Sequence, residues 1–563
     1  MSKFNKAIDV FETVPMKPLR QVLKYITLAL LCFSLIVACN GNRQQNPSTS
    51  NTNSPPRNGR IVIGTTLKPR TLDPADSYEA AGLNIIYNVA ESLYTYKVGT
   101  TELIPLLAEA MPKISDDGLV YTIPLRKGVK FHDGTPFNAE AMKFSLDRFI
   151  QNGGKPSFLL SDIVKDIKVS GEYQLTITLK KPFAAFASLL AFPGACAVSP
   201  KSYTIGEGQF KPNELVGTGP YKLVSFDGDS ISLTPFSDYW GEKPANQGID
   251  IQIYAGNSAN LYNSFLTGAI DVAYQTFAPP QITSLLQQAK NGSFQVLQGK
   301  GTVISYLVLN RNQPPLDKPE VRKAIASLIQ RSLFIERVLQ GQAEPLYSLI
   351  PTVFDVSLPV FQQGEGDIEL AKKLLTKAGF SASNPAVVEI WYPSASKVRS
   401  GVASTLRALA EEKLGGIIQF VPSGVESATA FSNLGKGVYA SFLGDWYPDF
   451  LDADNYIQPF LQCTRGDEKQ GCVEGGAQTQ GSFYYNGTVN QLIDQQRQEK
   501  QEAKRKAIFA QIQKILAEDV PYIPLWQNKD YVFFQNSIEG VYLNPSQQLP
   551  FWTLKTTDQT TKQ

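Results

Sequence analysis

Patterns typical of β-strands and of amphipathic helices alternate along most of this 563-residue chain, without a fixed repeat period. Segments rich in β-branched residues, such as Arg60–Thr65 (RIVIGT) and Gln174–Leu179 (QLTITL), indicate strands. Between such segments lie helical ones, such as Glu369–Ala378 (ELAKKLLTKA), which is followed by Gly379 as a C-terminal stop. Because a chain of this length holds three or four domain-sized units, the alternation predicts an α/β or α+β protein of several domains.

The single histidine of the chain, His132, limits the chemistry that the protein can perform. It excludes HExxH zinc sites, histidine-rich metal sites and any proton relay between two imidazoles. Charge is balanced, with 53 basic and 51 acidic residues, so no strong field points to nucleic acid or to an anionic membrane. We therefore expect no metal site, no cofactor and no nucleic-acid partner, and a structural role for His132.

Ile26–Ala38 (ITLALLCFSLIVA) is an uninterrupted apolar run near the N-terminus. A helix needs about 20 apolar residues to span a bilayer, so this run fits the apolar region of a signal peptide better. Lys17, Arg20 and Lys24 precede it as the positively charged region. The run closes with IVAC, which resembles a bacterial lipobox and implies cleavage before Cys39 and attachment of a lipid to its sulfur.

These features predict that residues 1–38 are a lipoprotein signal peptide, with Met16 as the possible true start. An uncleaved N-terminal anchor is the alternative, and in both cases the bulk of the chain lies outside the cytoplasm. Residues 39–57 are rich in Asn, Ser, Thr and Pro and cannot bury a core. We expect them to form a flexible tether that holds the folded part, by its lipid, near a membrane surface.

Cysteine usage agrees with export. Cys463 and Cys472 lie nine residues apart in a polar, glycine-rich segment, which predicts a loop-closing disulfide in an oxidising compartment. Cys196 lies in the apolar stretch AFPGACAV and is predicted to be a buried small hydrophobic residue.

Seven segments form an ordered set of motifs that spans nearly the whole chain after residue 38. The clearest is LRKGVKFHDGTPFNAEAMKFSLDR at Leu125–Arg148. The others are TLDPA at Thr71–Ala75, GTGPYKLVSF at Gly217–Phe226, YWG at Tyr239–Gly241, FLTGAIDVA at Phe265–Ala273, LNRNQPPLDKPEVRKAIA at Leu309–Ala326 and ILAEDVPYIPLW at Ile515–Trp526. In this order they closely resemble family 5 of the bacterial extracellular solute-binding proteins, the oligopeptide, dipeptide and nickel binders of ABC importers.

The resemblance implies an α/β fold of the type II periplasmic-binding-protein class, in which two lobes close around a cleft like a Venus flytrap. One lobe carries an extra domain. Carried over to this chain, lobe I comprises residues 58–92, 216–308 and 523–556, the extra domain 93–215, lobe II 309–522, and a polar tail 557–563. The chain is expected to cross the hinge near Asn310 and near Pro521–Pro524.

The resemblance also implies where a peptide ligand binds. In peptide-binding members an aspartate of the opposing lobe pairs with the ligand's terminal ammonium, and the segment Gly444–Tyr456 places Asp445 there. The segment departs from the family pattern, because Trp446 follows the aspartate and extra residues precede Asp454. Arg399 is the candidate for the ligand carboxylate, since a guanidinium can hold a carboxylate through two parallel hydrogen bonds.

Four aromatic residues are candidates for the cleft wall, because large rigid rings supply contact area at low entropic cost. They are Tyr94, Tyr306, Trp391 and Trp446. Each candidate has a structural alternative: Asp445 as a loop carboxylate, Arg399 as a surface charge at a helix start, and the rings as core residues. Asp449, Asp452 and Asp454 are expected to cap local structure or to face solvent.

The predicted function is capture of di- or oligopeptides and their delivery, chemically unchanged, to permease subunits driven by cytoplasmic ATPases. We expect a monomer and no enzyme activity. The same fold could instead hold a nickel complex, an opine, glutathione or an oligosaccharide, or signal to a membrane sensor. A serine hydrolase is disfavoured because the chain has no G-x-S-x-G motif, whereas a two-carboxylate glycosidase stays open.

Overall fold

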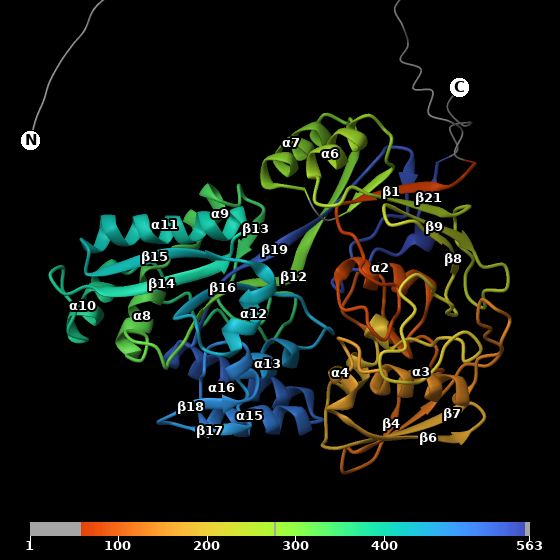
Figure 1. Cartoon of the computed structure of the whole chain (residues 1–563), viewed down its shortest axis with the longest axis horizontal. Helices are drawn as coiled ribbons and strands as arrows, with labels where there is room; N and C mark the ends of the chain where they lie inside the picture. Colours follow the sequence, from red (N-terminus) through yellow and green to blue (C-terminus); the bar gives the residue numbers. More distant parts are fainter. Residues whose placement is uncertain (1–57, 275–276, 558–563) are drawn as a thin grey trace, which may run out of the picture. The chain divides into compact units, whose positions relative to one another are not determined.

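The computed structural model describes residues 58–274 and 277–557 (Figure 1). The predicted signal peptide, Cys39 and the tether lie outside the described residues, as do residues 558–563 of the polar tail. The chain divides into the units Met1–Pro55 and Pro56–Gln563, and the second unit alone is described below. Within the described part of the chain, no helix is both long enough and apolar enough to cross a bilayer.

A mixed sheet of eleven strands is the framework of this unit. Its order is β15 (Ile418–Val425), β14 (Ala386–Pro393), β16 (Ser441–Trp446), β12 (Gln295–Leu309), β19 (Tyr522–Phe534), β11 (Val272–Tyr274), β1 (Ile61–Thr65), β10 (Ile249–Ile253), β9 (Ser230–Pro235) and β8 (Tyr221–Phe226), with β13 (Ala343–Pro345) also paired to β19. Strand β14 is parallel to β15 and β16, and β1 is parallel to β10 and β11. The other pairs in the sheet are antiparallel.

Strands β12 and β19 run side by side through the middle of the sheet (Figure 1). They pair antiparallel from Gln295 opposite Phe534 to Val308 opposite Tyr522. Beyond this pair, β19 continues the sheet through β11 and β12 continues it through β16. The two strands, called the central ribbon below, therefore join the part of the sheet that holds β14–β16 to the part that holds β1 and β8–β11.

Four apolar cores pack against the sheets. The β14–β16 core lies between the sheet and the helices α8 (Pro319–Leu328), α11 (Lys397–Leu414), α15 (Gly487–Gln498) and α16 (Glu502–Asp519). The β1–β10 core is covered by α2 (Ala80–Val89), and the α6–α7 core packs α6 (Ser258–Leu266) and α7 (Pro279–Lys290) on β11 and β19. The β5–β7 core joins α3 (Ala139–Gln151) to a second sheet, ordered β4 (Lys113–Ile114), β5 (Val120–Pro124), β7 (Gln174–Leu179) and β6 (Val164–Gly171).

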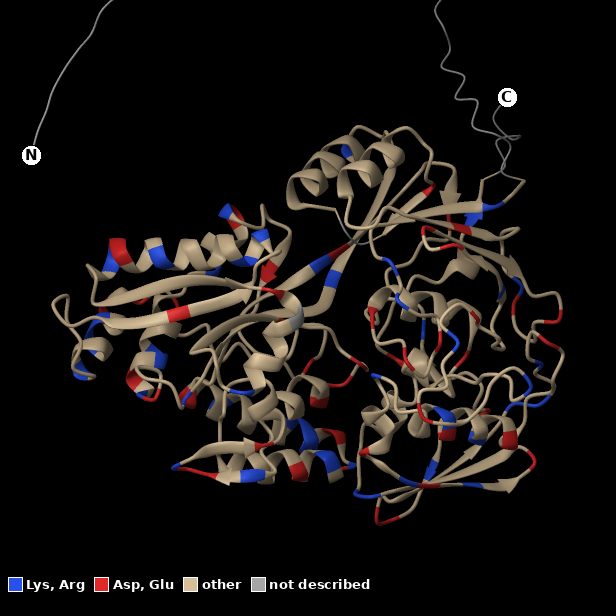
Figure 2. Ribbon diagram, viewed as in Figure 1, with Lys and Arg blue, Asp and Glu red and all other residues tan. Residues whose placement is uncertain are grey.

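Shorter elements connect these cores. They are β2 (Tyr94–Tyr96), β3 (Leu103–Pro105), α4 (Phe158–Ser161), α5 (Phe186–Leu189), η1 (Pro193–Ala195), α9 (Arg331–Arg337), α10 (Ile368–Lys377), α12 (Ser427–Gly435), η2 (Ala453–Tyr456), α13 (Gln458–Leu461), β17 (Arg465–Asp467), β18 (Gly471–Glu474), α14 (Gly476–Thr479), β20 (Ile538–Glu539), η3 (Phe551–Thr553) and β21 (Lys555–Thr556). Figure 2 shows acidic and basic residues interspersed along α11, α15 and α16, as the balanced composition leads one to expect.

The elements predicted from local pattern are present in the structure. The strand expected at Arg60–Thr65 is β1, and the helix expected at Glu369–Ala378 is α10, which Asp367 caps by accepting a hydrogen bond from the Leu370 amide at 2.9 Å. Gly379 follows α10 with a φ of 92°, a conformation that favours glycine. The boundaries given above for the two lobes and the extra domain stay predictions.

The predicted cysteine states are both found. Cys463 and Cys472 form a disulfide with their Cα atoms 5.5 Å apart, and it closes the β17–β18 hairpin. Cys196 is a buried free thiol. Burial raises the pKa of this thiol, which keeps it protonated and unreactive.

Two of the motifs meet in a buried ion pair. Arg148, the last residue of the longest motif, donates to both carboxylate oxygens of Asp73 in TLDPA, at 2.8 and 2.7 Å. Both side chains are almost fully excluded from solvent. Asp73 also accepts hydrogen bonds from the amides of Ala75 and Lys211, so its remaining lone pairs are used. The pair fixes α3 to the segment that leads into α2.

His132 joins the same long motif to the motif at Gly217–Phe226, as a structural residue. Its Nε2 lies 3.0 Å from the carbonyl oxygen of Gly219, and its backbone amide donates to the carbonyl of Gly217 at 2.9 Å. The ring packs edge-on against Phe236, with centroids 4.9 Å apart. Because a carbonyl oxygen only accepts, Nε2 carries the proton of the neutral ring. Burial lowers the pKa of His132 to about 4.

We expect the single imidazole to stay neutral through the physiological pH range. In NMR spectra of protein labelled with ¹⁵N-histidine, the one ring should show no titration between pH 8 and 5.5. The same sample in urea should titrate near pH 6.5, the ordinary value for an exposed histidine. A midpoint near 6.5 in the folded protein would contradict the buried Nε2–Gly219 contact.

Candidate functional site

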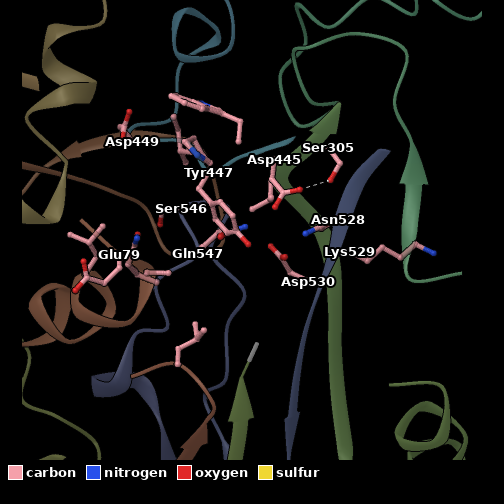
Figure 3. A pocket seen from close by; sticks show the side chains of 18 of the residues that line it. Glu79, Ser305, Asp445, Tyr447, Asp449, Asn528, Lys529, Asp530, Ser546 and Gln547 are labelled. Carbon is pink, nitrogen blue, oxygen red and sulfur yellow. Dashed lines mark hydrogen bonds between the residues drawn. The ribbon is translucent and has the colours of Figure 1, made fainter. Parts of the chain in front are cut away.

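A cavity of about 1140 Å³ lies beside the central ribbon. Its wall combines residues of β12 and β19 with the start of α11, the loop after β16, the segment before α2 and the segment Ser546–Gln548 (Figure 3). The volume exceeds the range of about 300–1,000 Å³ that suits most small-molecule ligands. A ligand of several linked units therefore fits this space.

Asp445 and Arg399, the two residues predicted to hold the ligand's charged ends, both line the cavity and contact each other. Asp445 lies on β16 opposite Ser305 of β12, whose hydroxyl donates to Asp445 Oδ1 at 3.1 Å (Figure 3). The other carboxylate oxygen forms an ion pair with the Arg399 guanidinium. The pair thus neutralises two half-buried charges within the wall.

The position of Arg399 follows from the start of α11. Ser396 caps this helix by accepting a hydrogen bond from the Arg399 amide at 3.3 Å, so Arg399 stands in the first turn and points to the cavity. Burial lowers the pKa of its guanidinium. Its Nε atom is buried and has no hydrogen-bond partner within the described ranges 58–274 and 277–557. Arg399 therefore retains a donor that a ligand could use.

Trp446 also lines the cavity, as predicted. Its indole nitrogen donates to the Asn455 side-chain oxygen at 3.2 Å, and its ring packs edge-on against Phe460 with centroids 5.1 Å apart. The neighbouring Tyr447 was not predicted. Its side chain remains 56% exposed although it belongs to the cavity wall, so its ring is available for contact with a ligand.

The other three predicted aromatic residues do not line this cavity. Tyr306 follows Ser305 on β12, and because successive side chains of a strand point to opposite faces, its ring lies in the β14–β16 core. Tyr94 is fully buried in the β5–β7 core. Trp391 packs against Tyr439, with ring centroids 4.9 Å apart, and donates to Glu389. Their structural alternative, core packing, describes them better.

The acids of the loop after β16 are more buried than expected. Asp452 does cap η2, yet it also holds Arg505 through two hydrogen bonds of 2.8 and 2.7 Å. Asp454 is buried beside Arg497. Asp449 accepts a hydrogen bond of 2.6 Å from the Tyr78 hydroxyl, and burial raises the pKa of Asp449 to about 6. The prediction that these acids cap local structure or face solvent is confirmed for Asp452, which caps η2, and is wrong for Asp449 and Asp454, which have partners of their own.

This loop ties the two sides of the cavity together. The Leu451 amide donates to the Tyr96 hydroxyl at 2.8 Å, and Phe450 enters the β5–β7 core, where it packs against Phe183. With the Tyr78–Asp449 hydrogen bond, the loop from β16 is held against elements that precede the central ribbon in the sequence. The conformation of the loop after β16 therefore depends on these contacts.

Tyr96→Phe removes the acceptor of the buried Leu451 amide. Loss of one buried hydrogen bond costs about 1–3 kcal/mol, so exchange at this amide should accelerate roughly 10-fold or more. Hydrogen exchange followed by mass spectrometry of peptides covering residues 447–452 would measure the change. Tyr121→Phe, which removes a hydroxyl bound to the Phe183 carbonyl within the same core, is the matched control. Equal exchange of the loop in both variants would show that Tyr96 does not hold it.

Comparison with known proteins identifies the family of this chain. The sequence profile of the bacterial extracellular solute-binding proteins, family 5 (middle region), matches residues 102–468. The chain belongs to this family. Like other family 5 folds, it is a two-lobed type II periplasmic binding protein with mixed α/β structure.

Three family 5 relatives show how close the likeness is. The probable D,D-dipeptide-binding periplasmic protein DdpA of Escherichia coli strain K12 is 28% identical over 505 residues, which is 86% of this chain and 92% of the relative. The glutathione-binding protein GsiB of Pectobacterium atrosepticum is 27% identical over 504 residues, with 87% and 92% covered. The periplasmic binding protein DppA of Helicobacter pylori, solved with the peptide STSA, superposes with a TM-score of 0.72 at 25% identity, covering 88% of this chain and 98% of that one.

Some residues that line the cavity were not predicted from the sequence. Ser305 and Asp530 lie on long strands of the central ribbon, and Tyr447 lies in a loop. A signal for Asp530 was present, since four consecutive polar residues, Gln527–Asp530, interrupt an otherwise apolar strand. Such an interruption breaks the pattern of a fully buried strand and indicates an opening in the wall.

Proposed function

We propose that this chain is the solute-binding component of an ABC-type importer, which captures peptides between its lobes and passes them unchanged to membrane permease subunits. The observation that carries the proposal is the Arg399–Asp445 ion pair in the wall of a cavity large enough for several residues. A peptide with free ends is itself a pair of opposite charges. Its carboxylate can share the guanidinium of Arg399, whose Nε is still without a partner among the described residues.

The relatives support a ligand of this chemistry. Their names state binding of a D,D-dipeptide and of glutathione, and the Helicobacter pylori protein was solved with a tetrapeptide. All three ligands carry both amino and carboxylate groups. Glutathione is therefore the second candidate, because it offers the same charged groups on a peptide-like backbone.

The N-terminal features complete the proposal. Solute-binding proteins of this family act outside the cytoplasm, and the signal and lipobox patterns support a chain that is exported and held to a membrane by a lipid on Cys39. The tether at residues 39–57 would give the folded part reach toward the permease. We propose a monomer that needs neither a metal nor a cofactor.

Arg399→Met tests the carboxylate contact. One charge-assisted hydrogen bond is worth about 1.5–3 kcal/mol, so affinity for peptides with a free carboxylate should fall roughly 10- to 150-fold. Isothermal titration of di-, tri- and tetrapeptides and of glutathione would measure it, with C-terminally amidated forms alongside. Amidation should weaken binding to the unaltered protein and have little further effect on the variant.

Asp166→Asn, on the exposed face of β6, is the control and should bind as the unaltered protein does. Mass spectrometry of the mixture after binding should return every peptide intact. Binding of none of these ligands, or release of a cleaved product, would contradict the proposal.

A further inference from the structure

Asp530 differs from the polar residues beside it on β19. Gln527 donates to Glu344 and Thr352, at 3.2 and 2.9 Å. The side chain of Asn528 accepts from the Trp526 indole at 3.2 Å, and Lys529 donates to the Gly341 carbonyl at 3.0 Å. The Asp530 carboxylate has no hydrogen bond and no ion pair within residues 58–274 and 277–557. It is the last residue of the run and faces the cavity (Figure 3).

The other acids of the cavity wall already have partners. Asp445 has Arg399 and Ser305, and Asp449 has the Tyr78 hydroxyl. Glu79 accepts hydrogen bonds from the amides of Arg70 and Tyr78, at 3.1 and 3.2 Å. Among the described lining residues, Asp530 is thus the acid left without a group to satisfy it. A half-buried carboxylate without a partner is costly to the protein, which makes it a candidate for binding a ligand.

An irregularity of the central ribbon makes room for this carboxylate. The ladder runs regularly to Lys300 opposite Lys529 and resumes at Ile304 opposite Gln527, so β12 bulges at residues 301–303. A Cβ atom at Gly301 would lie 2.9 Å from Asp530 Oδ1 and 2.6 Å from the Asn528 carbonyl oxygen, so the glycine leaves space that a side chain would fill. Bulges of this kind redirect side chains near functional sites.

The bulge is held in place from two sides. The Thr302 hydroxyl donates to the Pro545 carbonyl at 2.7 Å, and the Thr302 carbonyl accepts from the Tyr456 hydroxyl at 2.8 Å. Val303 and Ser305 flank Ile304, where the ladder resumes, and both line the same cavity. The bulge at residues 301–303, with Gly301, therefore lies beside the unpartnered Asp530 carboxylate in the cavity wall.

We propose that Asp530 binds the terminal ammonium of the peptide ligand, the task that the family resemblance assigns to Asp445. This inference rests on the proposed function. In this chain Arg399 and Ser305 already occupy the carboxylate of Asp445, so an ammonium there competes with a guanidinium. Asp530 offers two free oxygens in the same cavity. In Figure 3, Asp445, Tyr447 and Asp530 extend toward a common space, which would place Tyr447 beside the bound ligand.

Asp445 then acts as a positioning residue that holds Arg399 for the ligand carboxylate. A ligand with an ammonium at Asp530 and a carboxylate at Arg399 adds one partner to each without breaking the Asp445–Arg399 pair. Peptides with a blocked N-terminus, and solutes without a positive charge, would lose the Asp530 contact. The selectivity of the cavity would thus depend on a free amino group.

The protonation state of Asp530 should change when the ligand binds, and this change can be measured. Burial raises the pKa of Asp530 to about 7, so a large share of the empty protein carries this carboxyl protonated at pH 6.5. Lys529 and Tyr531 flank it on β19. The titratable groups on neighbouring elements are Lys300 on β12, Glu344 on β13, Asp445 on β16, Arg399 on α11, Tyr447 after β16 and Tyr456 on η2.

An ammonium bound to Asp530 stabilises the ionised carboxylate and so lowers its pKa, and binding then releases a proton. Because the free-state pKa is about 7, the empty protein at pH 6.5 holds a proton on Asp530 that binding of an ammonium releases. Affinity should rise as pH increases from 5.5 to 7. Above that range the ligand begins to lose its own charge, because α-amino groups titrate near 8.

The test is isothermal titration at pH 6.5 with Ala-Ala, D-Ala-D-Ala, Ala-Ala-Ala and glutathione, each with a free and an acetylated N-terminus. The unaltered protein, Asp530→Asn and Asp445→Asn are compared, in phosphate and in Bis-Tris buffer, which differ in ionisation enthalpy, to count released protons. We expect acetylation to weaken binding at least 10-fold in the unaltered protein and in Asp445→Asn, but less than 2-fold in Asp530→Asn. Proton release should disappear only in Asp530→Asn.

The outcomes separate this inference from the proposed function. If none of the peptides binds the unaltered protein, the proposed function fails and the inference fails with it. If they bind, but the acetylation effect persists in Asp530→Asn and vanishes in Asp445→Asn, the ammonium site is Asp445 and only the inference is overturned. If free and acetylated peptides bind the unaltered protein equally well, no carboxylate of the cavity holds the ammonium, and this result overturns the inference even if Asp530→Asn does not fold.

Discussion

The pairing of β12 with β19 is the interaction on which the rest of this structure depends. The two strands lie in the middle of the eleven-stranded sheet, where β12 pairs with β16 on one side and β19 pairs with β11 on the other. Where its ladder is interrupted, at residues 301–303, it borders the cavity. The pairing that joins the two parts of the sheet therefore also forms part of the wall of the cavity.

The electrostatics of the cavity follow from the cost of burying charge. Asp445 and Arg399 neutralise each other in the empty protein, which avoids leaving either charge unpaired in a partly dry wall. Asp530 meets the same cost by a different route, since burial raises its pKa and the carboxyl can take up a proton instead. The Asp445–Arg399 pair thus avoids an unpaired charge by pairing, and Asp530 avoids one by taking up a proton. A zwitterionic ligand can satisfy both, because it brings one charge of each sign.

Local elements, the fold and part of the site could be predicted from the sequence. The strand at Ile61–Thr65, the helix at Ile368–Lys377 and the Cys463–Cys472 disulfide depend on periodicity, capping and spacing, which are local properties. Family motifs led to Asp445, Arg399 and Trp446, which do line the cavity. The ion pair between Asp445 and Arg399 could not be predicted, because it joins residues of different elements whose side-chain directions depend on packing.

The predictions that the structure does not bear out also have physical explanations. Tyr306 was expected in the cleft, but the one-residue alternation along β12 puts Ser305 in the wall and Tyr306 in the core. Asp449 was expected to cap or to face solvent, and instead bonds Tyr78, a residue far from it in the sequence. Asp530 was overlooked because its role depends on a bulge in the partner strand. Register and long-range partners are not encoded in any short window of sequence.

We propose above all that the protein holds a peptide-like molecule with two charged ends and releases it unchanged. Mass spectrometry of the small molecule that co-purifies with the protein from its own host tests this claim most directly. We predict an intact peptide, or a close chemical relative, with a free amino group and a free carboxylate. A bound sugar, or a metal chelate without an amino group, would contradict the account.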